Sequence, residues 1–366
     1  MRMSPSSGFY VVDISNPAAP RQIREETFPS NANLVRASGQ TIYINSDSEL
    51  SIVNVSNPAL PQRLGNYLLS GPRIGSFTSI HASGPYAYLT DRDGFRVIDL
   101  SVLTQPRLLG FLSPPADSFF HRFSADSSYA FIASSRYLHV VDISNPYTPR
   151  LVRSAIPNSG YMDAMDTALW SNYVFVASLG ECSTGTGLWI FERINPDYPV
   201  QISSVPGTGR SFGVFVTASG SRTYAYLADA CGALHVVDVT APGSPFRVAT
   251  LSLPSTPYDV FVVAPYAYLA SPAGVLIVDV SSPAAPRLVN TYSIPNAMSL
   301  YGYGSRMYVA AYNGLYVLDI SNPVAPREIA YAYAWSGSDL VFADASRILW
   351  GDYRNGLSLM SLTTGA

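Results

Sequence analysis

The sequence contains no lysine, so all of its 22 basic residues are arginines. Schiff-base chemistry and a phosphate-binding loop of the P-loop type both need a lysine, and both are therefore excluded. Only 13% of the residues are charged, and the formal net charge is −3. Because there is no basic cluster, we expect no nucleic-acid partner.

Long apolar stretches and familiar catalytic motifs are also missing. No apolar run approaches the roughly 20 residues of a membrane-spanning helix, so we expect no membrane insertion. Residues 1–13 lack the apolar stretch of a signal peptide. Two cysteines and four histidines occur, without H-x-x-x-H, G-x-S-x-G or C-x-x-C spacing. The sequence therefore predicts no bound metal or cofactor and no catalytic residues of these kinds.

Turn-forming and strand-favouring residues are abundant instead. The chain has 28 prolines, 26 glycines and 25 tyrosines. No segment shows a sustained helical period, and proline recurs too often for long helices. This combination predicts an all-β fold.

One phrase recurs along the whole chain. Examples are VVDISNPAAPR at 11–21, VVDISNPYTPR at 140–150, IVDVSSPAAPR at 277–287 and VLDISNPVAPR at 317–327. The copies follow one another at intervals of roughly 40–50 residues, a period that suits a four-stranded unit. In residues 256–293, four runs rich in β-branched and aromatic residues are separated by Pro, Gly and Ser turns. We name these four expected strands a, b, c and d.

The VVDISNP and IVDVSSP phrases, with YAYL before them and PR after them, resemble the LVIVD repeat family of bacterial and archaeal proteins. The resemblance covers essentially the whole chain. It implies a β-propeller fold and an extracellular or cell-surface location, although no signal peptide is visible. The family's molecular function is mostly undefined.

The repeats together predict a single propeller domain over residues 1–366, with about eight four-stranded blades. Strands of type a are expected near eight positions: Asn33, Ser79, Arg122, Asp166, Gly213, Asp259, Ser299 and Asp339. Seven blades with a displaced terminal unit is the alternative. We expect the N-terminal strand 21–28 to close the ring against the C-terminal blade, which would remove exposed sheet edges. The strand at 9–14 would then compete with 357–362 for one place.

The repeated Asp of each VVD phrase is interpreted as a structural residue. Its carboxylate can accept backbone N–H groups of the Ser-Asn-Pro turn that follows. A ring of metal ligands is the functional alternative, and recurrence in nearly every blade argues against it. The following arginine, as in Arg150 and Arg287, is expected to pair with a neighbouring acidic group.

The two cysteines lie in b–c connections of consecutive units. Because these connections should emerge side by side, Cys182 and Cys231 are candidates for a disulfide. The alternative is two free thiols in a reducing compartment. The connection 179–187 is also long and rich in Gly, Ser and Thr, as functional loops often are.

The b–c and d–a connections should share one end of the central channel, and we expect binding there. The candidate binding residues at the channel mouth and in b–c loops are Asp91, Arg92, Asp93, Arg122, Asp166, Asp259, Asp339, Tyr353 and Arg354. The channel-mouth side chains could hold a cation or polar ligand, or they could instead cap the starts of strands a by bonding backbone N–H groups. Asp91-Arg92-Asp93-Gly94 faintly resembles a calcium loop but has too few oxygen ligands, and Asp-Gly is also an ordinary hairpin turn.

The sequence thus favours a non-catalytic binding or scaffold module that engages a protein or glycan through one loop face. Such a module needs exposed aromatic and Arg anchors, for which Trp335, Tyr353 and Arg354 are candidates. The alternative is a propeller hydrolase or lyase that uses the carboxylates of Asp166, Asp259 and Asp339. Because no motif supplies a reaction, we expect the chain not to be an enzyme.

Overall fold

A computed structural model gives the backbone strands along the chain and the side chains of its middle part. Side chains are described for residues 79–331 apart from 80, 82–84, 91–92, 100, 102–106, 117, 159–161, 183, 303 and 315. Outside this range, only the strands of residues 8–68 and 338–361 are described, as backbone. Every regular element among the described residues is a β-strand.

Six four-stranded antiparallel sheets succeed one another along the chain. The first three sheets consist of β7 (Ser79–Ser83), β8 (Tyr86–Thr90), β9 (Phe95–Asp99) and β10 (Arg107–Leu112); β11 (Phe120–Ala125), β12 (Tyr129–Ser134), β13 (Leu138–Asp142) and β14 (Arg150–Ala155); and β15 (Ala164–Trp170), β16 (Tyr173–Ser178), β17 (Thr186–Glu192) and β18 (Val200–Pro206). The next three consist of β19 (Ser211–Ser219), β20 (Arg222–Asp229), β21 (Ala233–Asp238) and β22 (Phe246–Ser252); β23 (Asp259–Val263), β24 (Tyr266–Ser271), β25 (Gly274–Asp279) and β26 (Arg287–Tyr292); and β27 (Ala297–Tyr303), β28 (Arg306–Ala311), β29 (Gly314–Asp319) and β30 (Arg327–Tyr333).

The remaining strands belong to the two ends of the chain. They are β1 (Gly8–Asp13), β2 (Arg21–Thr27), β3 (Ala32–Ser38), β4 (Thr41–Ser46), β5 (Glu49–Asn54), β6 (Gln62–Leu68), β31 (Ser338–Ala343), β32 (Arg347–Asp352) and β33 (Gly356–Ser361). A seven-stranded sheet has the order β31-β32-β33-β3-β4-β5-β6, and β33 meets β3 through Leu357 and Leu34. Strand β2 pairs with β1. The expected closure by strand 21–28 stays a prediction.

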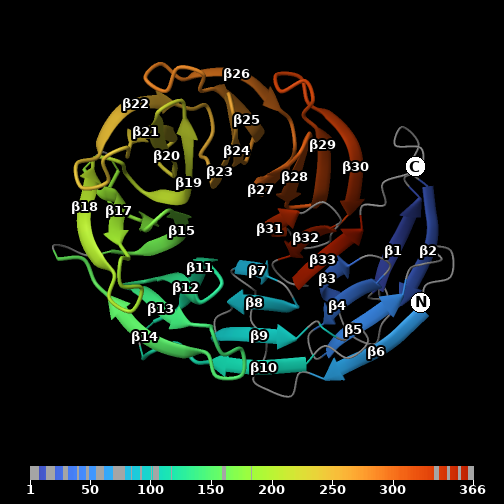
Figure 1. Ribbon diagram of the computed structural model, residues 1–366. Coiled ribbons are helices and arrows are strands. Elements are labelled where there is room, and N and C mark those ends of the chain that lie inside the picture. Colours follow the sequence, from blue (N-terminus) through green and yellow to red (C-terminus); the bar gives the residue numbers. More distant parts are fainter. Residues whose placement is uncertain are drawn as a thin grey trace.

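The sheets form a ring in which each four-stranded sheet is one blade of a β-propeller (Figure 1). The first strand of each blade lies nearest the centre, and the fourth lies on the outside. Innermost strands of successive blades contact one another from β7 through β11, β15, β19, β23 and β27 to β31. If β31–β33 and β3–β6 are taken as two blades, the ring has the eight units that the sequence predicts; if their common sheet is taken as one, it has the alternative seven.

Apolar side chains fill the space between neighbouring blades. Tyr268 and Ile277 of one blade pack in one cluster with Leu300, Val309 and Leu318 of the next. The second and third strands are buried on both faces, which explains their nearly continuous apolar sequences. Each fully buried Val, Leu or Ile stabilises the fold by about 1.5–3 kcal/mol, so every blade depends on its neighbours for a core.

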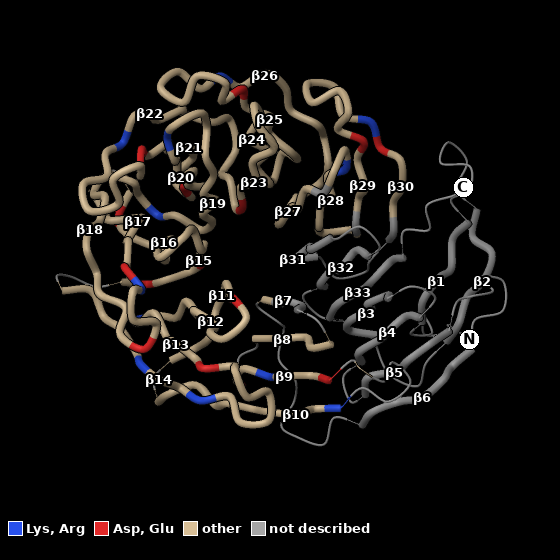
Figure 2. The backbone as a smooth tube through the Cα atoms, in the orientation of Figure 1, with Lys and Arg blue, Asp and Glu red and all other residues tan. Residues whose placement is uncertain are grey.

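The connection between the third and fourth strands has the same structure in most blades. In the β23–β26 blade, Asp279 accepts the Ser281 N–H at 2.9 Å and pairs with Arg287 at 2.9 Å. These bonds from Ser281 and Arg287 hold the pKa of the Asp279 carboxyl below its usual value. The same acid–turn–arginine arrangement occurs at Asp99–Arg107, Asp142–Arg150 and Asp319–Arg327. Figure 2 shows such acidic and basic positions on the outer strands. The structural interpretation of the repeated Asp and Arg is therefore confirmed in these blades.

Candidate functional site

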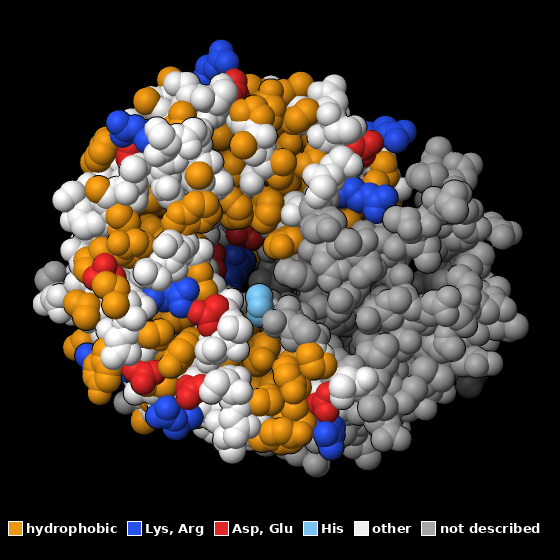
Figure 3. All heavy atoms as spheres, viewed as in Figure 1, with side chains coloured by type: hydrophobic (Ala, Val, Ile, Leu, Met, Phe, Trp, Pro, Cys, Tyr) orange, Lys and Arg blue, Asp and Glu red, His pale blue; other side chains and the backbone are white. Residues whose placement is uncertain are grey.

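Arg122 lies at the mouth of the central channel and contacts two of the predicted aspartates. One guanidinium nitrogen, Nη1, is 3.2 Å from Oδ1 of Asp259 and 3.7 Å from Oδ2 of Asp166. The three side chains come from the innermost strands β11, β15 and β23. Figure 3 shows the ring hollowed at its centre, with acidic and basic side chains inside the hollow. The structure thus brings together three residues that the sequence predicted for the channel mouth.

Asp166 joins its own blade to the next. Its Oδ1 accepts the N–H of Thr167 at 2.8 Å, and its Oδ2 accepts the N–H of Val214 in β19 at 3.3 Å. Burial is the main cause that raises the pKa of the Asp166 carboxyl to about 6. The charge of Asp259 raises this pKa further, whereas the charge of Arg122 lowers it. The folded protein therefore holds a proton on Asp166 at mildly acidic pH.

Asp259 makes the equivalent connection to the blade after its own. Its Oδ2 accepts the Oγ–H of Ser299 at 2.7 Å and the N–H of Leu300 at 3.2 Å, both in β27. Its Oδ1 accepts the N–H of Val260 at 2.9 Å. Since Asp166 and Asp259 both bond backbone N–H groups near the start of a neighbouring innermost strand, the geometry supports the strand-capping interpretation of these carboxylates.

Gly213 occupies the corresponding position in β19, between Asp166 and Asp259. A Cβ atom there would lie 3.1 Å from Oδ1 of Asp259 and 3.2 Å from its Cα. The missing side chain leaves room for the Asp259 carboxylate beside β19. The sequence placed Gly213 in an innermost strand but carried no signal for this packing.

The other predicted binding residues are only partly described. Asp93 is half-buried in the connection between β8 and β9, but Asp91 and Arg92 lie outside the described residues. Tyr353, Arg354 and Trp335 also lie outside them, and Asp339 belongs to β31 without a described side chain. Within the described part of the chain, no group of three His, Cys, Asp or Glu residues is placed to hold a metal ion. The expectation of no bound metal or cofactor, with calcium at 91–94 as the alternative, stays a prediction.

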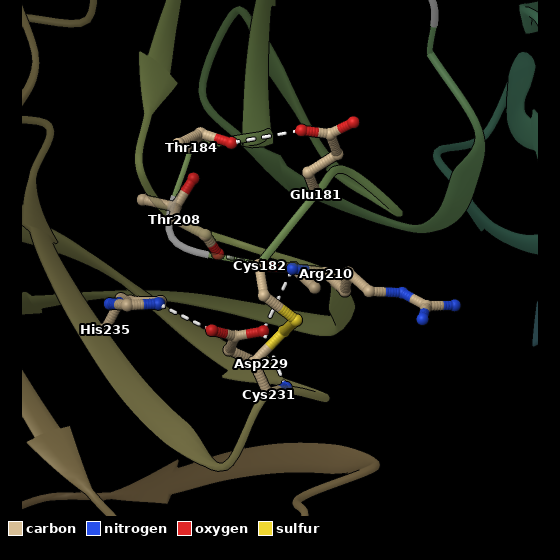
Figure 4. Close-up of a disulfide and its surroundings, with 9 residues drawn as sticks. Glu181, Cys182, Thr184, Thr208, Arg210, Asp229, Cys231 and His235 are labelled. Carbon is tan, nitrogen blue, oxygen red and sulfur yellow. Dashed lines mark hydrogen bonds and ion pairs between the residues drawn. A yellow bond between two sulfur atoms is a disulfide. The ribbon is translucent and has the colours of Figure 1, made fainter.

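Cys182 and Cys231 form a disulfide, with their Cα atoms 5.8 Å apart (Figure 4). Cys182 lies between β16 and β17, and Cys231 between β20 and β21, so the bond joins the b–c connections of consecutive blades. Both residues are exposed. This is the pairing that the positions of the two cysteines predicted.

Asp229 anchors the backbone beneath this disulfide. Its Oδ1 accepts the N–H groups of Arg210 and Cys231, each at 2.9 Å. Its Oδ2 lies 3.0 Å from Nε2 of the buried His235. Burial alone would raise the pKa of the Asp229 carboxyl, but the bonds from His235, Cys231 and Arg210 outweigh it, and the pKa is lowered. Asp229 is therefore ionised near neutral pH, and His235 donates to it.

His139 occupies the matching position of β13 and forms a contact that sequence analysis missed. Its Nε2 lies 2.8 Å from Oγ of Ser118 and 3.0 Å from Oγ of Ser134, and its Nδ1 lies 2.9 Å from Oγ of Ser154. Burial lowers the pKa of His139 to about 4, so the ring is neutral near pH 7. Ser118 and His139 are both buried, and a base with so low a pKa removes a serine proton poorly. This serine–histidine contact serves packing rather than nucleophilic catalysis.

The end of the ring that carries the b–c and d–a connections is named the channel face here; the other end is named the opposite face. Because strands alternate in direction, Phe119, Ile156 and Tyr312 all belong to the channel face, and their side chains are 56%, 61% and 61% exposed. Arg136, Glu181 and Arg210 are exposed there too. The opposite face also exposes large apolar side chains, among them Tyr147, Ile194 and Tyr198.

The two faces differ in regularity. On the opposite face, five connections share a turn in which the N–H of one residue bonds the carbonyl three residues earlier: 145–148, 195–198, 241–244, 282–285 and 322–325. On the channel face, the connections vary in length from blade to blade, and two b–c connections are joined by the disulfide. Variation within one chain indicates loops that are not needed to build each blade.

A model of the LVIVD repeat matches seven regions of the sequence: 6–24, 29–68, 74–112, 124–155, 216–250, 257–294 and 296–333. Together these regions make up more than half of the chain. They leave out residues 156–215, which contain the β15–β18 blade, Asp166 and Cys182. A search of curated protein sequences found no match.

Solved structures of similar shape have little sequence identity to this chain. Sqt1 from Saccharomyces cerevisiae is 8% identical, with a TM-score of 0.67 over 98% of this chain and 100% of that chain. BamB from Moraxella catarrhalis is 12% identical, with a TM-score of 0.58 over 90% of this chain and 96% of that chain. A functionally unknown protein from Desulfotomaculum acetoxidans is 12% identical, with a TM-score of 0.61 over 88% of this chain and 99% of that chain. At these identities the similarity concerns the fold alone. Among the described residues there is no helix capable of crossing a membrane.

Proposed function

Because this chain belongs to the LVIVD repeat family and folds as a β-propeller, we propose that it is a non-catalytic binding module that engages a protein or glycan through its channel face. The observation that carries this proposal is the contrast between the two faces. The opposite face repeats one turn, whereas the connections of the channel face vary from blade to blade. Both faces expose large apolar side chains, and those of the irregular face are Phe119, Ile156 and Tyr312. Exposed aromatic side chains are typical anchors of binding surfaces.

The charged residues of the channel mouth support a binding module rather than an enzyme. The carboxylate oxygens of Asp166 and Asp259 are engaged by Arg122 and by backbone N–H groups of neighbouring strands. Groups bound in this way hold blades together and are poorly placed to exchange protons with a substrate. The structural similarity to Sqt1 and BamB extends only to the propeller fold.

A glycan microarray and a panel of purified extracellular-matrix proteins provide the first test, with binding measured for the full chain. A triple variant, F119S/I156S/Y312S, removes the channel-face anchors. The matched control, Y147S/I194S/Y198S, removes three equally exposed apolar side chains from the opposite face. The proposal expects the first variant to lose binding by at least about tenfold, as loss of a few anchors does, and the control to retain it. If the first variant retained binding and the control lost it, the binding surface would lie on the opposite face and the proposal would be wrong.

A hydrolase or lyase is the second candidate, and one observation favours it. Because Asp166 and Asp259 contact the same Arg122 nitrogen at 3.7 and 3.2 Å, their oxygens lie less than about 7 Å apart, which is below the roughly 9.5 Å upper limit for paired carboxylates in glycosidases. The raised pKa of Asp166, about 6, would suit a general acid. Chromogenic glycosides and polysaccharides test this candidate: turnover that is abolished in both D166N and D259N would favour the enzyme over the binding module.

A further inference from the structure

Three segments of the channel face are bonded together at the start of β19. The segment 207–210 lies between two b–c connections, 179–185 and 229–232, and we name these three segments the clamp. The Gly207 N–H bonds the Gly185 carbonyl at 3.0 Å, and Leu179 forms a β-bridge with Arg210. On the other side, the Ala230 N–H bonds the Arg210 carbonyl at 2.8 Å. The Cys182–Cys231 disulfide joins the two outer segments across this central one.

The central segment is closely packed against Asp229. Gly209 has a φ of +68°, and a Cβ atom there would lie 2.3 Å from Oδ2 of Asp229. Only a glycine fits this close approach, which lets the Asp229 carboxylate reach the Arg210 N–H. Figure 4 shows the Arg210 side chain extending away from Asp229. The clamp thereby presents a cationic side chain on the channel face.

The blades beneath the clamp share a buried apolar core, in which Leu188 of one blade and Leu227 of the next lie in one cluster. Leu188, Leu227 and Leu234 are fully buried under these connections. Local bonds also shape each outer segment: the Gly185 N–H bonds the Glu181 carbonyl at 2.7 Å, and the Gly232 N–H bonds the Asp229 carbonyl at 2.9 Å. The two blades are therefore packed through contacts other than the disulfide, which joins the loops above them.

The disulfide is also open to chemical attack. Cys182 and Cys231 are both exposed, so a thiolate from solution can approach either sulfur. A buried disulfide would be shielded from such thiol–disulfide exchange. The disulfide is exposed, the two blades below it are held together by a shared apolar core, and the loop between its cysteines is tightly bonded. These features indicate a constraint that can be removed without unfolding the ring.

We propose that the Cys182–Cys231 disulfide is a redox-sensitive clamp that orders one sector of the channel face and thereby controls binding there. The binding consequence rests on the proposed function. In the reducing step, a thiolate of a small dithiol attacks one protein sulfur and breaks the S–S bond, forming a mixed disulfide. The second thiol of the reductant displaces the protein sulfur. The protein gains two electrons and two protons as two thiols, and the dithiol becomes its cyclic disulfide.

Hydrogen exchange of the full chain, with and without dithiothreitol, tests the clamp directly. Thiol alkylation and mass measurement report whether both cysteines are reduced, and far-UV circular dichroism reports the fold. We expect amides in 179–185, 207–210 and 229–232 to exchange at least about tenfold faster after reduction, while those of β23–β26 change less than about twofold, because local opening leaves the other blades closed. The C182S/C231S variant should behave like the reduced chain and remain folded at 25 °C.

Three results would overturn the clamp: loss of the β-sheet signal on reduction, unchanged exchange in the three segments, or cysteines that resist reduction in the folded protein. A second experiment measures affinity for the glycan or protein that the wild-type chain binds in the array and panel. It compares the oxidised chain, the reduced chain and the C182S/C231S variant. We expect a loss of at least about fivefold in affinity without the disulfide, since preorganised loops bind more tightly. Faster exchange with unchanged affinity would show that the disulfide does not control binding. The proposed function would still be tested separately by the F119S/I156S/Y312S variant.

Discussion

Arg122 and Asp259 lie 3.2 Å apart although they belong to blades that are three units apart around the ring. The Arg122 side chain spans the channel mouth, where it also meets Asp166. Both partners are largely buried, so the pair resembles an interior ion pair more than a surface one. The contact connects non-consecutive blades.

The first prediction concerns this contact. Arg122→Gln should lower the free energy of unfolding by about 2–4 kcal/mol, because it leaves two buried carboxylates without their cation. Arg150→Gln is the matched control, since its pair with Asp142 is on the exposed rim and should be worth less than about 1 kcal/mol. Urea denaturation measures both. Equal effects of the two substitutions would show that the channel-mouth pair has no special role.

The second prediction concerns Gly213. Gly213→Ala should destabilise the chain by about 1–3 kcal/mol, because its Cβ would press on Asp259 in a closely packed site. Gly243→Ala is the control, since a Cβ there would meet nothing within 4 Å. Thermal unfolding compares the stability of the two variants. If Gly213→Ala left the stability unchanged, Asp259 would be free to move away from the added Cβ.

The third prediction concerns pH. The folded-state pKa of Asp166 is raised to about 6, so its stabilising contribution is present below the unfolded value near 3.8 and is lost as pH rises toward 6. The folded-state pKa of His139 is lowered from 6.5 to about 4, so its contribution is present above 6.5 and is lost as pH falls toward 4. Between pH 4 and 6 the two effects oppose each other, each with a slope of up to about 1.4 kcal/mol per pH unit.

Asp166→Asn should therefore make the free energy of unfolding fall more steeply on acidification than in the wild type, and His139→Gln should make it fall less steeply. Urea denaturation at intervals between pH 4 and 7 gives the curves. The other carboxylates are common to all three proteins, so differences from the wild type isolate each group. Parallel curves would contradict the assigned pKa shifts.

The fourth prediction separates the two bonds of the repeated turn. Asp279→Ala removes the acceptor of the Ser281 N–H and should cost about 1–2 kcal/mol. Arg287→Gln removes only an exposed ion pair and should cost less than about 1 kcal/mol. Chemical denaturation compares the two variants. A larger loss for Arg287→Gln would make the ion pair, rather than the turn, the reason for the repeat.

The repeat allowed most of the fold to be predicted from the sequence. Regularly spaced copies of a four-stranded unit with apolar second and third strands can bury their faces only against one another. The roles of Asp279 and Arg287 followed from local turn chemistry, and the disulfide followed from the placement of the two cysteines in consecutive blades.

The channel-mouth contacts could be predicted only in part. The sequence placed Arg122, Asp166 and Asp259 at the mouth, but the reach of Arg122 across the channel depends on the diameter of the ring and on the space left by Gly213. The bonds of Asp166 and Asp259 to the next blade depend on how neighbouring innermost strands are staggered. No local pattern encodes these distances, because the residues are some 40–140 positions apart in a chain of roughly 40–50-residue repeats.

The central claim is that the channel-mouth charges hold the ring together while the loops of the channel face bind. Titration of the bound glycan or protein against Asp166→Asn and F119S/I156S/Y312S tests it most directly, with folding checked in parallel. The account predicts affinity within about twofold of the wild type for Asp166→Asn, and a loss of at least about tenfold for the triple variant, as expected when anchor side chains are removed. Lost binding in a folded Asp166→Asn, together with full binding by the triple variant, would contradict it.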